Sequence, residues 1–321
     1  MTVTNFQEIC GIPQWDWGQI ELWRTHDGGD TWQRSAIVGP EAPDSVVSCA
    51  DEGTLQLSSV PAVGPKGENY VVWQYGPTFT ASTSTDADIV VARSLDGGVT
   101  FQSFVKVADI NSMRGNSPVG YNRSRLSDHP RIAVAQTGKN KGRVYVAFYS
   151  AVAPVALSPS GSQVSSQVYV SYSDDRGLTW STPVPVTPDM PATTVKRFWP
   201  VVTLQPGGNI DVVYQESREV EATPEVGDTE CTQGGKTATF SSLVDTYWSR
   251  SLDGGKSFES PIKLSTATTN WCTTASNIIP NFGDYIGATS GGNRVLAVWA
   301  DGRNGVPDTF YAQGQSAVKA R

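Results

Sequence analysis

Charge is scarce in this chain, and positive charge is the scarcer kind. Charged residues make up 17% of the 321 residues, with 24 basic against 31 acidic side chains. A general nucleic-acid binder needs a basic surface, so this composition argues against nucleic acid as a partner. The chain has only two histidines, His26 and His129, and its four cysteines form no paired Cys/His spacing. We therefore expect neither a metal site nor a cofactor.

Long hydrophobic runs are absent as well. No segment approaches the ~18 consecutive apolar residues of a membrane-spanning helix, so we expect no membrane insertion. The first ten residues lack the charged and apolar regions of a signal peptide,. Runs of helix-forming residues at helical spacing are missing too, whereas Ser, Thr and Val are plentiful, and 31 glycines and 20 prolines supply many turns. These features predict an all-β protein.

What the chain does contain is a repeated phrase. "RTHDGGDTW" at 24–32 returns as "RSLDGGVTF" at 93–101, "SDDRGLTW" at 173–180 and "RSLDGGKSF" at 250–258. The copies lie about 70 to 80 residues apart and carry the aspartates Asp27, Asp96, Asp175 and Asp253,. An Asp accepts hydrogen bonds from its own turn, Gly adopts a positive φ, and the final aromatic residue packs onto the core. The phrase therefore predicts a hairpin turn in which the Asp is structural.

These phrases resemble the Asp-boxes, or BNR repeats, of sialidase-like β-propellers. Through its repeats the resemblance covers nearly the whole chain. It implies one domain, 1–321, built as a β-propeller of five or six four-stranded blades, with each box between the third and fourth strands. The strands around the boxes give five modules, of which the first and last are incomplete. A strand near residues 2–6 is expected to complete the last module and close the ring.

The antiparallel order of such strands places the boxes and the short turns on one face and the long loops on the other. Function usually resides in long loops on a rigid scaffold. Aromatic, acidic and guanidinium side chains gather in or beside these loops, a mixture that suits a carbohydrate, which we expect as the partner. Alternatively, the Arg–Asp pairs are links between blades and His129 is a packed histidine.

The resemblance also implies roles for these residues. Sialidases bind the carboxylate of their sugar with three arginines and use a Tyr nucleophile activated by a Glu, with an Asp as acid/base. The corresponding candidates are Tyr285 as nucleophile, Glu216 as its partner, Asp128, Asp284 or Asp301 as acid/base, and Arg131, Arg197, Arg218 and Arg303 as carboxylate ligands. The further candidates for substrate contacts are Trp73, Tyr75, His129, Trp199 and Tyr214. The family's early Phe/Tyr-Arg-Ile-Pro motif is not present, and "PRIA" at 130–133 is similar to it.

Three functions stay open on this sequence. They are a sialidase-like glycoside hydrolase of unassigned sugar, a non-catalytic glycan-binding or adhesion propeller, and a polysaccharide lyase that uses Tyr285 and His129 near a uronate. Two carboxyl groups about 5–10 Å apart across an open site favour an enzyme, whereas carboxyl groups bound to Arg between blades favour a binder.

The four cysteines all fall on the face of the long loops. We hypothesise two disulfides, Cys10–Cys49 and Cys231–Cys272, that hold these loops, and four free thiols would contradict this. The chain is then expected to be secreted or at the cell surface. We also expect a monomer.

Overall fold

All regular structure in this protein is β-strand. The computed structural model describes residues 1–7, 17–38, 54–77, 86–113, 129–153, 165–191, 195–218, 231–233, 236–238, 243–270, 274 and 285–315. Within these residues no helix occurs, and therefore none that is long and apolar enough to cross a membrane. The all-β prediction is confirmed for this part of the chain.

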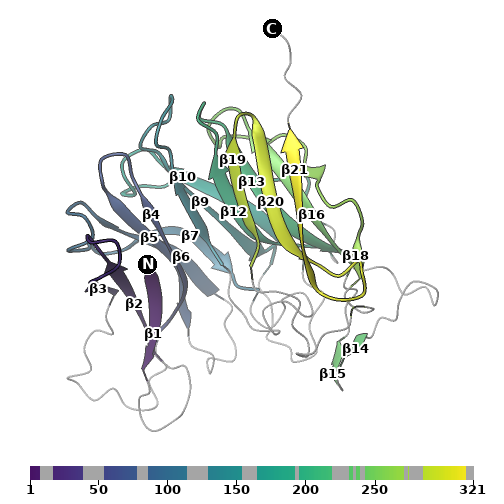
Figure 1. Ribbon diagram of the computed structural model, residues 1–321, viewed down its shortest axis with the longest axis horizontal. Coiled ribbons are helices and arrows are strands. Elements are labelled where there is room, and N and C mark those ends of the chain that lie inside the picture. Colours follow the sequence, from purple (N-terminus) through teal and green to yellow (C-terminus); the bar gives the residue numbers. More distant parts are fainter. Residues whose placement is uncertain are drawn as a thin grey trace.

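The strands form five successive modules of antiparallel strands, of which modules three and four share one nine-stranded sheet through a parallel contact between one strand of each. In Figure 1, modules one and two lie on the left and modules four and five on the right. Module one contains β1 (Thr2–Gln7), β2 (Trp17–Arg24) and β3 (Gln33–Val38). Module two contains β4 (Thr54–Val63), β5 (Asn69–Pro77), β6 (Asp86–Ser94) and β7 (Val105–Asn111). Module three contains β8 (Arg131–Val134), β9 (Val144–Ala151), β10 (Ser166–Ser173) and β11 (Val184–Pro185).

Modules four and five complete the series. Module four contains β12 (Val195–Leu204), β13 (Ile210–Arg218), β16 (Leu243–Ser251), β17 (Ile262–Lys263) and β18 (Thr269–Asn270). Module five contains β19 (Gly287–Gly291), β20 (Arg294–Asp301) and β21 (Asp308–Gln315). A separate hairpin consists of β14 (Cys231–Gln233) and β15 (Lys236–Ala238).

The core lies between consecutive modules rather than within any one of them. Strand β9 is buried along its whole length because its two faces meet different neighbours. Tyr145 and Ala147 join the core shared with modules four and five, whereas Val144 and Val146 join the core shared with module two. The first strands β4, β8, β12 and β19 contact one another in that order. Stacking of the modules therefore brings the starts of these inner strands together.

The four repeated phrases form the turns β2–β3, β6–β7, β10–β11 and β16–β17. In the last of them, Oδ1 of Asp253 accepts hydrogen bonds from the Ser251 hydroxyl and from the backbone N–H groups of Lys256 and Ser257, and Oδ2 accepts one from the Ser257 hydroxyl. The Ser251 hydroxyl in turn accepts the N–H of Gly255, which has a positive φ of 93°. Corresponding bonds recur at Asp27, Asp96 and Asp175. They are the bonds that the repeated phrase predicts.

We call the end of the strands that carries the repeated turns the turn end. Contacts at this end also hold neighbouring modules together. Arg93 of module two donates to two backbone carbonyls in the module-three turn, and Arg143 of module three donates to one in the module-four turn. Between modules four and five, Asp211 pairs with Arg250 at 2.6 Å, with both side chains buried, and also accepts the Ser290 hydroxyl. The turn end is therefore occupied by contacts that hold the fold.

One expectation about the ends of the chain is wrong. Strand β1 pairs with β2 of module one, with Thr2 opposite Leu22, and does not complete module five. The antiparallel partner next along the chain satisfies the backbone of β1 directly. No pairing between modules one and five occurs among the described strands, so a closed ring and its number of blades stay predictions.

The turn carboxylates predict an acid-sensitive contribution to stability. Burial acts to raise the pKa of Asp253, but the hydrogen bonds from Ser257 and Ser251 outweigh it and lower this pKa to about 2. The folded-state pKa lies below that of the unfolded chain, so the contribution is present above about pH 4 and is lost as the pH falls towards 2. We expect Asp253→Asn to lower the free energy of unfolding by about 1 kcal/mol at neutral pH.

Denaturant unfolding of Asp253→Asn at neutral and acidic pH tests this expectation. The matched control is Glu259→Gln, which removes the same charge from an exposed residue of the same hairpin. The control is expected to change stability little. Equal effects of the two variants, or a difference that does not shrink in acid, would contradict the role of Asp253.

Candidate functional site

The described site candidates lie towards the ends of their strands opposite the repeated turns. Strand β8 begins at Arg131, Tyr285 shortly precedes β19, and β13 and β20 end at Arg218 and Asp301. The side chains fall into three groups. We call them the Glu216 network (Thr187, Asp189, Arg197, Tyr214, Glu216, Arg218 and Tyr247), the Asp301 cluster (Thr269, Trp299, Asp301 and Arg303) and the His129 cluster (His129, Arg131, Tyr149, Trp199 and Tyr285).

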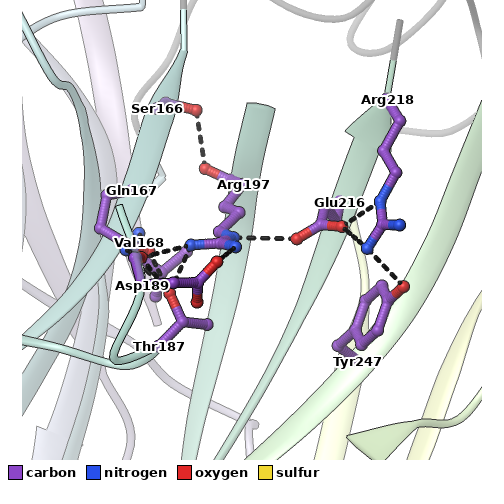
Figure 2. A network of polar contacts seen from close by, with 9 residues as sticks. All are labelled: Ser166, Gln167, Val168, Thr187, Asp189, Arg197, Glu216, Arg218 and Tyr247. Carbon is purple, nitrogen blue, oxygen red and sulfur yellow. Dashed lines mark hydrogen bonds and ion pairs between the residues drawn. The ribbon is translucent and has the colours of Figure 1, made fainter. Parts of the chain in front are cut away.

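The Glu216 network links modules three and four. Arg197 and Glu216 are cross-strand partners on β12 and β13, with Nε of Arg197 2.8 Å from Oε2 of Glu216. The guanidinium of Arg197 also reaches module three, where it donates to the Thr187 hydroxyl and, at 2.8 Å, to Oδ2 of Asp189. Figure 2 shows Arg197 between these groups, with Arg218 on the far side of Glu216.

Most of this network is closed to solvent. The side chains of Arg197 and Glu216 are 7% and 3% exposed, whereas that of Arg218 is 58% exposed. Burial acts to lower the pKa of Arg197, but the hydrogen bonds to its two carboxylate partners outweigh this and raise it. Tyr214 stacks on Tyr247, and burial, together with the nearby Glu216, raises the pKa of Tyr214. Because guanidinium groups contact both oxygens of Glu216, this carboxylate is held in place rather than presented to a substrate.

The Asp301 cluster joins modules four and five in a similar way. Asp301 is 1% exposed and accepts hydrogen bonds from Arg303 at 2.6 Å, from the Thr269 hydroxyl at 2.7 Å and from the indole N–H of Trp299 at 3.1 Å. Burial acts to raise the pKa of Asp301, but these donors, with Arg303 the strongest, lower it below its ordinary value. Asp301 therefore stays ionised and paired.

The His129 cluster lies among the inner strands of modules three, four and five, with His129 just before β8, Trp199 within β12 and Tyr285 shortly before β19. The ring of His129 lies edge-on to Trp199 and to Tyr285, with centroid separations of 5.6 and 5.7 Å. His129 and Trp199 are 6% and 5% exposed, whereas Tyr285 is 66% exposed. A buried imidazole thus lies directly behind a phenol that solvent reaches.

Arg131 gives this cluster its charge. Burial lowers the pKa of Arg131, and the phenols of Tyr285 and Tyr149 partly offset that effect. Burial, with the Arg131 charge as a second cause, lowers the pKa of His129 to about 3, so the imidazole is neutral at ordinary pH. Arg131 donates from Nη1 to the Pro130 carbonyl at 3.1 Å. Within the described ranges it has no carboxylate partner, unlike the arginines of the other two groups.

The remaining aromatic candidates belong to the packing of the fold. Trp73 is fully buried with Ile20 in the core between modules one and two, and both Trp73 and Tyr75 pack on Phe104. Tyr214 is fully buried as well. The expectation that Trp73 and Tyr214 stack on a sugar is therefore wrong, because neither ring has an accessible face.

Several expectations concern residues that the structure does not describe. Asp128, Asp284, Cys10, Cys49 and Cys272 lie outside the described residues, as does the side chain of Cys231 at the start of β14. The two disulfides and two of the three proposed acid/base residues therefore stay predictions. In the part of the chain that the structure describes, no group of three or more His, Cys, Asp or Glu side chains could hold a metal ion.

Sequence reasoning missed five contact residues, namely Tyr149, Thr187, Asp189, Tyr247 and Thr269. Tyr247 could have been found by aligning β13 with β16, because this register places it directly opposite Tyr214. No sequence pattern indicates Asp189, since its contact with Arg197 depends on the parallel pairing that brings β10 beside β12.

Comparison with known proteins gives weak similarities. No protein-family profile and no curated protein matches the chain. Among solved structures, a Dyadobacter fermentans protein of unknown function is 17% identical over 92% of this chain and 83% of its own, with a TM-score of 0.42. A polysaccharide lyase described as an ulvan lyase is 12% identical over 92% of this chain, with a TM-score of 0.45, and this chain spans only 62% of that protein.

A third solved structure is the α-L-arabinofuranosidase of Fusarium graminearum in complex with arabinobiose. It is 14% identical over 92% of this chain and 85% of its own, with a TM-score of 0.44. With TM-scores below 0.5, these similarities establish neither a common fold nor a common activity.

The two carboxylate partners of Arg197 predict unequal effects on stability. Glu216→Gln leaves a buried guanidinium without its buried partner, and we expect it to lower the free energy of unfolding by about 3 kcal/mol. Asp189→Asn is the matched control, because it removes the same charge from a side chain that is 63% exposed, and we expect a loss below about 1 kcal/mol,. Denaturant unfolding measures both. Similar losses would show that the Glu216 pair has no special role in stability.

Burial of neutral His129 predicts a pH-dependent stability. In the folded protein this imidazole takes up a proton only near pH 3, but in the unfolded chain it does so near its ordinary value of 6.5. The unfolded state therefore binds more protons between these values, and the free energy of unfolding falls as the pH decreases, by up to ~1.4 kcal/mol per pH unit.

We expect His129→Gln to remove this part of the pH dependence. The comparison is made by denaturant unfolding from neutral to acidic pH, with His26→Gln, an exposed turn residue, as the control. A slope that His129→Gln leaves unchanged would be incompatible with a buried neutral imidazole at this position.

Proposed function

We propose that this chain is a carbohydrate-active protein of the sialidase-like β-propeller type, and that the His129 cluster binds an acidic sugar. The repeated turns and the five stacked modules support the propeller architecture. One observation carries the choice of site. Arg131 is a partly buried cation with no carboxylate partner among the described residues, and it lies beside the exposed phenol of Tyr285.

The charge of Arg131 defines the ligand chemistry. A desolvated guanidinium attracts an anion more strongly than an exposed one, and its planar donors match the two oxygens of a carboxylate. A uronate in a polysaccharide carries such a group on the sugar ring. The neutral His129 adds no competing charge, and Tyr285 supplies a hydroxyl on the solvent side. A polysaccharide substrate also implies action outside the cell, so we propose a secreted or cell-surface protein.

The reaction we propose is cleavage by β-elimination. Arg131 binds the uronate carboxylate and neutralises the negative charge that develops when the adjacent carbon loses its proton. Tyr285 is the proposed base, and its phenol oxygen accepts that proton once it has given up its own. The bond from the next carbon to the leaving glycosidic oxygen breaks, a carbon–carbon double bond forms, and Tyr285 returns the proton to the leaving oxygen. No water is consumed, and the product is an unsaturated uronate.

A sialidase-like glycoside hydrolase is the second candidate. The exposed Tyr285 beside Arg131 favours it, because a sialidase-like nucleophile needs that accessibility. The described carboxylates count against it, since Glu216 and Asp301 are buried and bound by arginines instead of facing each other across an open site,. The elimination mechanism needs neither of these carboxylates.

The test is cleavage of a panel of uronate polysaccharides, neutral polysaccharides and sialosides. Ultraviolet absorbance detects an unsaturated product, and a reducing-end assay detects cleavage of either kind. We expect an unsaturated product from a uronate substrate. Tyr285→Phe is expected to lower kcat about a hundredfold or more, and Arg131→Met to weaken binding at least ~tenfold. Arg294→Met, an exposed arginine at the turn end, is the control.

Each other outcome separates the alternatives. Saturated products would favour the hydrolase, and calorimetric binding of an acidic saccharide without cleavage would favour a glycan-binding propeller. An equal loss of activity in Arg294→Met would argue that Arg131 acts through stability alone. Absence of binding to every acidic saccharide would overturn the proposal.

A further inference from the structure

A series of aromatic contacts runs from the core to the exposed Tyr285. Phe198 packs edge-on against Trp199 at a centroid distance of 5.8 Å, Trp199 packs edge-on against His129, and His129 packs edge-on against Tyr285. Exposure rises along the series, with 1% for Phe198 and 66% for Tyr285. The buried indole of Trp199 therefore lies between the core and the imidazole.

The backbone at Trp199 is unusual for so large a residue. Its φ is +49°, in the left-handed region that favours glycine, and the β12–β13 register is interrupted between Phe198 and Val201,. Strain of this kind persists where the surrounding structure holds the residue firmly, and it is concentrated at functional sites. With 5% exposure, Trp199 offers no open ring face to a sugar.

We propose that Trp199 is a positioning residue of the site rather than a substrate contact. Held by the bulge in β12, its indole fixes the orientation of the His129 ring, and through that ring the placement of Tyr285. This inference rests on the proposed function only for its effect on catalysis. The contact between Trp199 and His129 is testable without any substrate.

The first measurement is nuclear magnetic resonance of the histidine side chains, since the chain has only His129 and His26. The titratable groups that the structure places against the His129 ring are Arg131 and Tyr285. In the unaltered protein we expect the His129 signals to stay fixed between about pH 7 and 5. In Trp199→Ala water reaches the imidazole, so its signals are expected to move and to titrate at a higher pH. Trp199→Phe keeps an edge-on ring and is expected to preserve the signals.

The second measurement is the split between kcat and KM on the substrate that the panel identifies. Trp199→Ala is expected to lower kcat at least ~tenfold while KM changes less than about threefold, because a misplaced reacting group loses rate more than affinity. Trp199→Phe should restore most of kcat. Ser58→Gly, at the matching bulge of β4 where φ is +61°, is the backbone control and should leave the His129 signals and kcat unchanged.

The two measurements separate this inference from the proposed function. If no substrate is found, the proposed function fails, yet the histidine signals still decide whether Trp199 holds His129. His129 signals that are unchanged in position and titration in Trp199→Ala would overturn the inference. Should that variant not fold, Trp199→Phe decides, because a raised KM with an unaltered kcat would mark Trp199 as a substrate contact instead.

Discussion

The inner sheets of this protein have two apolar faces, and the need to bury both determines the arrangement of the whole chain. Strand β9 has no exposed residue, so module three is stable only with a neighbour on each side,. Strand β20 in module five alternates instead, with Leu296 and Val298 exposed on one face. Because every inner module lies between two others, the first strand of each lies next to the first strand of the next. The His129 cluster lies among three of these first strands, β8, β12 and β19.

Buried ion pairs lie at module boundaries at both ends of the strands. Asp211 with Arg250 joins modules four and five at the turn end, and Glu216 with Arg197 joins modules three and four at the other. A buried ion pair contributes little net stability, but removing one partner leaves an uncompensated charge and is strongly destabilising. Arg131 differs from these arginines, because it has no carboxylate partner among the described residues and lies beside the phenols of Tyr149 and Tyr285.

The sequence predicts the turns well and the site only in part. The reason is that the turns depend on contacts between residues close in the sequence, whereas the site depends on contacts between residues far apart in it. The bonds at Asp253 join residues within a few positions of each other, so the phrase alone carries them. The partner of β1 depends on which edge lies nearest in space, and the expected partner in module five is wrong because β1 pairs with β2. The sequence suggested His129 and Tyr285 as a pair and, as an alternative, a packed His129, but it did not indicate that the packed imidazole lies behind an exposed phenol. Burial of that kind depends on how the modules stack, which no local pattern records.

Equivalent positions in successive modules carry different side chains. Strands β4, β8 and β12 end at Val63, Val134 and Leu204, and counting back equally from these residues reaches Ser58, His129 and Trp199. The bulge with positive φ occurs at the first and third of these positions. Each of these three modules thus has an equivalent position beside the inner strand of its neighbour. A hydroxyl, an imidazole and an indole can occupy it without altering the turns that hold the fold, because those turns lie at the opposite end of the strands. Substitutions at this position therefore leave the bonds of the repeated turns in place.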